Sequence, residues 1–426
     1  MKKPIFILII RRHSGELDWI LPLLYKFKNK YRIISIFSNK DAYESVQRNL
    51  SLFNIWHEIS KEYFVITKKS NLLWKIMLHI ISKFNFNHIS LFYKLNKFLK
   101  EKVFDVDHFL SIFNIKITDI KAIFITTTHL TSLPSTFKKK NSKILLIRYP
   151  ESSMIIASKK ENFKILRPLI YRRVIGDLFL FTSKANKDFF LGDQNSRFYK
   201  KSIYYSSVPR YEDWWLKKFV NTKKNNDKSF RILVLLRSPN STYFQRSSFH
   251  ETINSIMKLA SEYNDCKIIF KTHPSDRDIT MLKSSLSKFS KDKWEIREEH
   301  AMTLAVMSNF CISIITSACL DSLALKVPTV EYYMIKKEIE MSHKAKSCVH
   351  IVFNSSKKKW QTIFNYKELV NTVSSYNELK KYFLMVYLNK KSRSWNKSFH
   401  NFKRINQQGH STNSLYKIIS KKIDKS

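Results

Sequence analysis

The sequence predicts an α/β protein made of two doubly wound halves. Short continuous apolar runs, which suit buried parallel strands, alternate with segments of helical spacing in both halves of the chain. At 426 residues the chain is longer than one hydrophobic core usually supports, and the polar stretch KNNDKS (residues 224–229) is typical of a link between domains. We therefore expect one α/β domain over residues 1–222, a second over 229–378, and basic C-terminal helices or a tail over 379–426.

In the first half, strands and helices alternate from the start of the chain. PIFILII (residues 4–10) predicts a buried strand, and residues 15–27 predict a helix because their apolar side chains recur at helical spacing. A second strand is expected over residues 31–38, followed by a second helix. Three later apolar runs predict further strands, at residues 121–128, 142–152 and 177–183. This alternation is typical of βαβ units and a parallel sheet.

The second half begins the same alternation again. Residues 230–238 predict a buried strand, and a helix follows over 248–263. KIIFKTH (residues 267–273) predicts a strand that ends at a His-Pro turn, and residues 310–333 predict a strand, a loop rich in hydroxyls, a helix and another strand. Open α/β sheets bind ligands at the carboxyl ends of their strands, so these turns are the places to look for a site.

Glycine and cysteine usage excludes several classes of protein. The chain has four glycines, far apart from one another, so it contains neither a P-loop nor a G-x-G-x-x-G turn. This argues against kinases, P-loop NTPases and ordinary dinucleotide oxidoreductases. The four cysteines form no C-x-x-C pair, and we interpret them as buried thiols of a protein in a reducing compartment rather than zinc ligands.

Cationic side chains gather at predicted strand ends in the second half. His273 and Pro274 follow the strand KIIFKTH, Lys271 lies within its last residues, and Arg237 ends the preceding strand. An imidazole or a fixed positive charge can stabilise a phosphate that leaves during group transfer. A lone His-Pro dipeptide is also a common structural turn, so its functional interpretation depends on what lies beside it.

A Thr-Ser pair occupies the loop that follows the next predicted strand. Thr316 and Ser317 lie where the strand turns into a helix that begins near Cys319. Their hydroxyls can cap this helix and can also donate to phosphate oxygens, and the two roles are compatible. Together with the His-Pro turn, this loop predicts a phosphate-binding site.

These motifs resemble those of GT-B glycosyltransferases. The His-Pro turn and the Thr-Ser loop are similar to motifs of bacterial sialyl-, polysialyl- and Kdo-transferases and, more distantly, of teichoic-acid glycerol-phosphate transferases. The segment VPRYEDWW (residues 208–215) is similar to the interdomain segment of capsule and surface-polysaccharide enzymes. The resemblance is strongest over residues 230–333. It implies that His273 faces the phosphate or carboxylate of a nucleotide-sugar donor, with a CMP-activated acidic sugar favoured. We expect no metal or other cofactor to take part.

Carboxylates supply the other roles that the resemblance implies. Asp321 lies where many GT-B enzymes carry an acid that binds the ribose hydroxyls, and Glu331 is a second candidate at the end of the next predicted strand. The acceptor hydroxyl needs a general base from the first half. Glu151 is slightly favoured for this role by its place after a strand, and Glu16 and Asp18 compete with it in the first loop and helix.

Two D-x-D triplets offer an alternative, metal-dependent chemistry. Residues 105–107 open a predicted helix, and residues 276–278 lie just beyond the His-Pro turn. We interpret both as solvated acids and expect no metal site.

A second enzyme hypothesis is a transferase that moves a polyol phosphate from a CDP donor and uses the same histidine. Detection of a phosphodiester product, in place of a glycosidic one, would distinguish it.

The net charge of +42 predicts an anionic partner. Residues 71–103 are basic and aromatic and predict amphipathic helices, which either pack on their own domain or lie against an anionic membrane. We expect a cytoplasmic enzyme at the periphery of the inner membrane that transfers sugar to a surface glycan or a lipid-linked acceptor. A nucleic-acid binder is disfavoured because the basic residues are spread over the whole chain.

Overall fold

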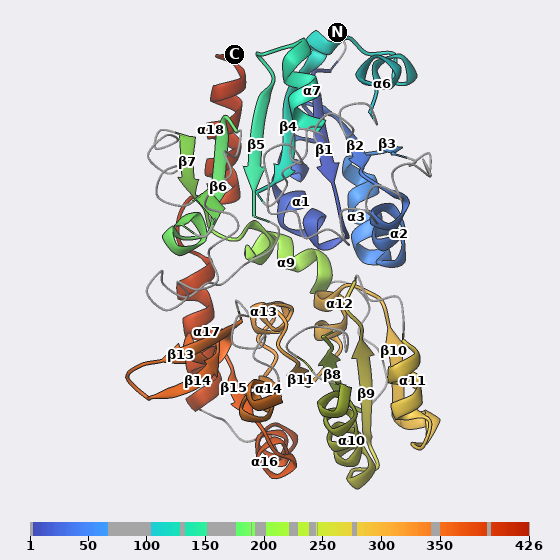
Figure 1. Cartoon of the computed structure of the whole chain (residues 1–426), viewed down its shortest axis with the longest axis vertical. Helices are drawn as coiled ribbons and strands as arrows, with labels where there is room; N and C mark the ends of the chain where they lie inside the picture. The colour runs from blue at the N-terminus through green and yellow to red at the C-terminus, as the bar shows by residue number, and fades with distance from the viewer. Residues whose placement is uncertain are drawn as a thin grey trace, which may run out of the picture.

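Two parallel β-sheets, one in each half of the chain, organise the computed structural model of the protein (Figure 1). The lobe built on the first sheet is called the N-lobe, and the lobe built on the second sheet is called the C-lobe. The structure describes residues 3–66, 104–127, 133–150, 176–188, 190–191, 202–220, 229–237, 244, 246–274, 279–341, 350–389 and 393–425. The amphipathic helices predicted over residues 71–103 lie outside these described residues.

The N-lobe sheet has seven parallel strands in the order β3-β2-β1-β4-β5-β6-β7. The strands are β1 (Ile5–Ile10), β2 (Arg32–Phe37), β3 (Glu62–Val65), β4 (Ile120–Thr126), β5 (Leu145–Tyr149), β6 (Leu178–Phe181) and β7 (Ile203–Tyr205). The helices are α1 (Gly15–Phe27), α2 (Lys40–Arg48), α3 (Leu50–Ile59), α6 (Val106–Ile112), α7 (Leu133–Lys140) and α9 (Asp213–Val220), with the short 3-10 turns η1 (Ile117–Asp119) and η3 (Pro209–Tyr211).

The C-lobe sheet has six parallel strands in the order β10-β9-β8-β11-β12-β15. The strands are β8 (Phe230–Leu235), β9 (Cys266–Lys271), β10 (Trp294–Arg297), β11 (Phe310–Ser313), β12 (Thr329–Tyr332) and β15 (Asn371–Val373), and β13 (Ile351–Asn354) and β14 (Lys359–Thr362) form a separate hairpin. The helices are α10 (Arg246–Glu262), α11 (Thr280–Leu286), α12 (Ala301–Val306), α13 (Cys319–Ala324), α14 (Ile335–Met341), α15 (Ile363–Tyr366) and α16 (Tyr376–Tyr387), with the 3-10 turn η4 (Lys291–Lys293).

Burial on both faces explains why the central strands are continuously apolar. In β1 the side chains of Phe6 and Leu8 enter one hydrophobic cluster, whereas Ile5 and Ile7 enter another on the opposite face of the sheet. A strand covered by helices on both sides gains apolar burial from every residue, so alternation with polar residues is lost. The prediction of two doubly wound α/β halves is confirmed.

The C-terminal helices return from the C-lobe to the N-lobe. Helix α17 (Arg393–Asn406) and helix α18 (Thr412–Ile423), red in Figure 1, run beside both lobes. The ring of Phe402 packs 5.1 Å from that of Tyr211, and the ring of Tyr416 packs 4.6 Å from that of Phe27 on α1. The C-terminal segment therefore contributes to the packing of the N-lobe.

Within the described part of the chain, no helix combines the length and the apolar character needed to cross a membrane.

Candidate functional site

A cleft of about 300 Å³ lies between the two lobes, where the carboxyl ends of strands from both sheets face each other. The N-lobe contributes residues 13–15, which follow β1. The C-lobe contributes residues 235–237 and 271–274, which begin at the last residues of β8 and β9, and residues 316–318, which follow β11. In both sheets the chain reverses its winding beside the central strand, which is the usual position of a ligand in an α/β sheet. The cleft is therefore the candidate site.

The cationic residues proposed from the sequence meet in this cleft. Arg237, Lys271 and His273 all border it, and Lys271 is only 8 % exposed. Burial lowers the pKa of Lys271, and nearby carboxylates, Asp321 first among them, only partly oppose this. The C-lobe thus presents a wall of basic side chains to the cleft.

His273 is uncharged in this environment. Burial, followed by the charges of Arg237, His13 and Lys271, lowers the pKa of His273 to about 3. Its ring lies 6.1 Å from the ring of His13, edge to face, across the cleft. Near neutral pH the imidazole is therefore a hydrogen-bonding group, and it gains a proton only when an anion balances the surrounding positive charge.

The Thr-Ser loop borders the same cleft. The hydroxyl of Thr316 accepts a hydrogen bond from the backbone N–H of Ala318 (3.3 Å), and Ser317 is the next lining residue. The preceding residue, Ile315, has φ of +42°, a conformation that is unusual for a β-branched side chain. Such backbone conformations cost about 1–3 kcal/mol and are concentrated at functional sites.

A buried ion cluster, here called the interlobe clamp, joins Asp18, Arg210, Asp321, Tyr211 and His300. Nη1 of Arg210 lies 2.6 Å from Oδ2 of Asp18, and its Nη2 donates to Oδ1 of Asp321. The Tyr211 hydroxyl donates to the same Asp321 oxygen at 2.9 Å. The clamp ties α1 of the N-lobe to α13 of the C-lobe through η3, which lies in the segment VPRYEDWW.

His300 completes the clamp and is held as a hydrogen-bond donor. Its Nδ1 accepts from the backbone N–H of Met302 (3.2 Å), so its Nε2 carries the proton that is donated to Oδ2 of Asp18 at 2.9 Å. The ring stacks on Phe219 with 4.8 Å between ring centroids. Both ring nitrogens of His300 are therefore occupied, which leaves neither as a base.

Burial and the neighbouring charges shift the pKa values of Arg210, Asp321 and Asp18 in the clamp in different directions. Burial opposes the charge of Arg210, but Asp18 and Asp321 outweigh burial and raise the pKa of Arg210. Burial also raises the pKa of Asp321 despite Arg210. For Asp18 the opposing effects of Arg210 and His300 exceed that of burial, so its pKa is lowered. Asp18 is thus ionised and weakly basic, and Asp321 is engaged by protein groups although both acids line the cleft.

Two of the other proposed carboxylates, Glu331 and Glu16, do not border the cleft. Glu331 is fully buried and accepts hydrogen bonds from the hydroxyls of Thr362 and Thr372. Burial raises the pKa of Glu331 to about 7, and these hydroxyls oppose the shift. Glu16 is also buried and accepts from the backbone N–H of Arg11 at 2.6 Å, so neither side chain borders the cleft. Glu151 lies outside the described residues.

The first D-x-D triplet has a structural role. Asp105 caps α6 by accepting hydrogen bonds from the backbone of the helix's first turn, and Asp107 pairs with Lys140 at 2.6 Å. Residues 276–278, the second triplet, lie outside the described residues. Among the residues that the structure describes, no group of three or more acids, histidines or cysteines is arranged to hold a metal ion.

Four residues in and beside the cleft were not singled out from the sequence: His13, Arg48, Arg210 and His300. Arg210 lies within VPRYEDWW, whose resemblance to an interdomain segment was the available signal. The others are single charged or aromatic residues with no motif around them. Only the folded arrangement shows that they converge.

Acid unfolding provides a test of the buried histidines. Burial and Arg237 lower the pKa of His350 to about 3, as for His273. Because the unfolded chain binds these protons below about pH 6.5 and the native state does not, each histidine should make the free energy of unfolding fall by about 1.4 kcal/mol per pH unit as the pH drops from about 6.5 to 3.

Replacement of either histidine should weaken this dependence of the free energy of unfolding on pH. Stability measured in urea between pH 4 and 7 should depend less steeply on pH in His273→Asn and His350→Asn than in the wild type, whereas the exposed control His400→Asn should keep the wild-type slope. Glu331, whose pKa is raised, acts in the opposite direction between about pH 4.5 and 7, so the difference between variant and wild type is the informative quantity. Equal slopes in all proteins would contradict the burial of uncharged imidazoles.

Comparison with known proteins identifies the fold. No family model and no curated protein matches the chain. Among solved structures, a candidate UDP-N-acetylglucosamine 2-epimerase from Listeria monocytogenes is similar over 100% of this chain and 98% of its own, with a TM-score of 0.58 and 11% identity. The 2-epimerase of Neisseria meningitidis bound to UDP-GlcNAc covers 99% and 100%, with a TM-score of 0.53 and 12% identity. A glycosyltransferase of kitacinnamycin covers 99% and 100%, with a TM-score of 0.51 and 9% identity. The protein therefore has the GT-B fold of two Rossmann-like domains facing a central cleft.

Proposed function

We propose that the protein is a metal-independent glycosyltransferase that moves a sugar from a nucleotide donor to a surface glycan or a lipid-linked acceptor. The observation that carries the proposal is the convergence of Arg237, Lys271, His273 and the Thr316–Ser317 loop on one interlobe cleft. These groups donate hydrogen bonds or positive charge, and the diphosphate or phosphate of a nucleotide sugar is the natural partner of such a set.

The chemistry assigns different tasks to the two lobes. Lys271 and Arg237 would neutralise the nucleotide phosphate as the bond to the anomeric carbon breaks, and His273 would donate a hydrogen bond to the departing oxygen. The acceptor hydroxyl would lose its proton to a base on the N-lobe. Glu151 stays the preferred candidate for that base because Asp18 is weakened by Arg210 and His300.

A pyrimidine nucleotide is the proposed leaving group. The resemblance of the motifs favours a CMP-activated acidic sugar. UDP is the second choice, because solved structures with this fold include the Neisseria 2-epimerase bound to UDP-GlcNAc and S. aureus MnaA with UDP.

The proposal is tested by product analysis. Purified protein is incubated with CMP-, CDP-, UDP- and GDP-linked substrates, with and without membrane-derived lipid acceptors, and nucleotide release and the linkage of the new bond are followed by chromatography and NMR. We expect donor-dependent release of nucleotide and a glycosidic product. A phosphodiester product would establish the CDP-polyol phosphotransferase instead, and an epimerised sugar nucleotide without transfer would contradict the proposal.

Membrane association is proposed from the charge and gives a separate prediction. With a net charge of +42, the protein should sediment with vesicles that contain anionic lipid, at about 1 kcal/mol for each basic residue close to the surface. Raising the salt from about 0.1 to 0.5 M should release it, because screening shortens the range of the attraction. Neutral phosphatidylcholine vesicles are the control, and equal binding to both kinds of vesicle would contradict an electrostatic attachment to the inner leaflet.

A further inference from the structure

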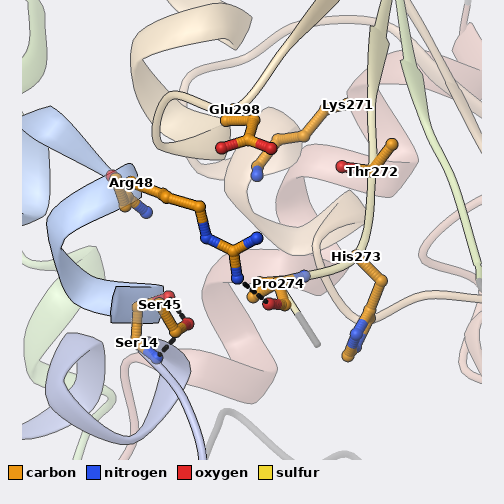
Figure 2. Close-up of a pocket in the computed structure, with 9 residues that line it drawn as sticks. Ser14, Ser45, Arg48, Lys271, Thr272, His273, Pro274 and Glu298 are labelled. Carbon is orange, nitrogen blue, oxygen red and sulfur yellow. Dashed lines mark hydrogen bonds between the residues drawn. The ribbon is translucent and has the colours of Figure 1, made fainter. Parts of the chain in front are cut away.

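A small side pocket opens beside His273, on the N-lobe side of the cleft. Figure 2 shows it between α2 and the end of β9, with the guanidinium of Arg48 reaching toward Pro274. The pocket has a volume of about 20 Å³, which is room for one or two waters or for a single substituent group, and not for a sugar ring. A ligand in the cleft can extend into it, because the two spaces share the lining residues Ser14, Asn49, Lys271, Thr272, His273 and Pro274.

The side pocket holds two cations that form no direct ion pair with a carboxylate within the described part of the chain. Nη2 of Arg48 donates to the carbonyl oxygen of Pro274 at 3.4 Å, a long hydrogen bond that leaves most of its donors available. Among the described residues, neither Arg48 nor the 8 % exposed Lys271 forms an ion pair with an acid. Glu298 also borders the pocket, but it is exposed and lies beyond ion-pair distance of both cations. The surrounding carboxylates, Asp321 and Glu298 foremost, offset the burial of Lys271 only in part, and such an ammonium is expected where an anionic ligand supplies the missing charge.

The other walls also offer hydrogen bonds. The buried hydroxyls of Ser14 and Ser45 lie together, with the Ser14 N–H donating to Oγ of Ser45 at 3.0 Å. Asn49, which caps α3 through its side-chain oxygen, borders the pocket and keeps its amide N–H groups for a ligand. A planar or tetrahedral anion would therefore meet a guanidinium, an ammonium and neutral donors in a space of its own size.

We propose that this side pocket binds a carboxylate or phosphate carried by the acceptor, so that the protein selects an acidic glycan or a phosphorylated lipid-linked acceptor. The inference rests on the proposed function and names the substrate class of the same site. Arg48, Ser14, Ser45 and Asn49 all come from the N-lobe, opposite the C-lobe groups assigned to the nucleotide. On the C-lobe side, Lys271 and its neighbours at the end of β9 border both spaces, which places the anionic group next to the reacting centre.

The test uses small acidic sugars as probes for the acceptor group. The protein, saturated with the nucleotide that binds it best, is titrated with glucuronate, glucose 6-phosphate and glucose at constant ionic strength, and binding is followed by ligand-observed NMR. We expect glucuronate or glucose 6-phosphate to bind at least tenfold more tightly than glucose, and the stronger of the two identifies the carboxylate or the phosphate as the natural group. Arg48→Gln should lower that affinity roughly tenfold or more, because a charged hydrogen bond is lost.

Lys40→Gln is the matched control, since it removes one positive charge from the exposed start of the same helix. It should leave the binding of both acidic sugars unchanged, and Arg48→Gln should leave the affinity for the nucleotide unchanged. The inference is overturned if glucose binds as well as the acidic sugars, if no acidic sugar binds, or if Arg48→Gln binds them like the wild type. Failure of every nucleotide to bind would instead overturn the proposed function, so the two failures are distinguishable.

Discussion

Arg210→Met is expected to lower the free energy of unfolding by about 3–5 kcal/mol, a large fraction of the stability of a typical protein. Arg210 is the sole cation in direct contact with both Asp18 and Asp321 among the described residues, and all three side chains are buried. Removing it leaves two carboxylates in a low-dielectric interior without their ion-pair partner, and Lys271, which is not in direct contact with them, compensates only in part. Urea unfolding at pH 7 measures the effect.

Three further variants separate charge from lost packing. Tyr211→Phe removes one hydrogen bond to Asp321 and should cost about 1.5–3 kcal/mol. The triple variant Asp18→Asn, Arg210→Met, Asp321→Asn should recover a large part of the stability, since no buried carboxylate of the clamp is left without its counter-charge. Arg404→Met, an exposed control, should behave as the wild type. If Arg210→Met unfolds within about 1 kcal/mol of the wild type, the clamp does not hold the lobes together.

Lys271→Met is expected to lower kcat/KM for the nucleotide donor by about 10²–10³-fold without loss of stability. The charge would stabilise the leaving phosphate, so its loss reduces transition-state binding. In the absence of ligand the ammonium is buried without a direct ion pair among the described residues, and the acids near it offset its burial only in part. An apolar side chain of similar length should therefore leave the free energy of unfolding equal or higher. Steady-state kinetics and urea unfolding on the same preparation measure both quantities.

Lys267→Met provides the comparison for this prediction. Lys267 lies on the same strand, β9, one residue after its start and outside the residues that line the cleft. Its replacement should change neither activity nor stability by much. An active Lys271→Met enzyme, or one destabilised by several kcal/mol, would show that this lysine is structural rather than a ligand for phosphate.

The fold was predictable because its signals are local. Each central strand is a continuous apolar run, and this pattern arises from burial on both faces of a parallel sheet, as Phe6 and Ile7 show in β1. The helix expected over residues 15–27 is α1 with the same bounds. The convergence of His273 with the Thr316–Ser317 loop also followed from strand ends, since carboxyl ends of parallel strands lie at one edge of a sheet.

The acids of the site could not be assigned in this way because their roles depend on distant partners. Asp321 was proposed for the ribose, yet its carboxylate meets Arg210, which is 111 residues away in the sequence. Glu331 lies in β12, one residue before the strand ends, and its side chain accepts hydrogen bonds from Thr362 and Thr372. Tertiary packing decides which acid faces a ligand and which faces another side chain. The periodicity of strands and helices carries no information about this packing.

Titration of the wild-type protein with CMP, UDP, CDP and GDP, read as a shift in thermal or urea stability, tests most directly whether the interlobe cleft is a nucleotide site. We expect a pyrimidine nucleotide at about a hundred times its dissociation constant to raise the free energy of unfolding by about 2.7 kcal/mol. We also expect the shift to be lost in Lys271→Met. If no nucleotide stabilises the wild type, or if the shift survives in Lys271→Met, the cationic wall of the cleft does not bind a donor phosphate.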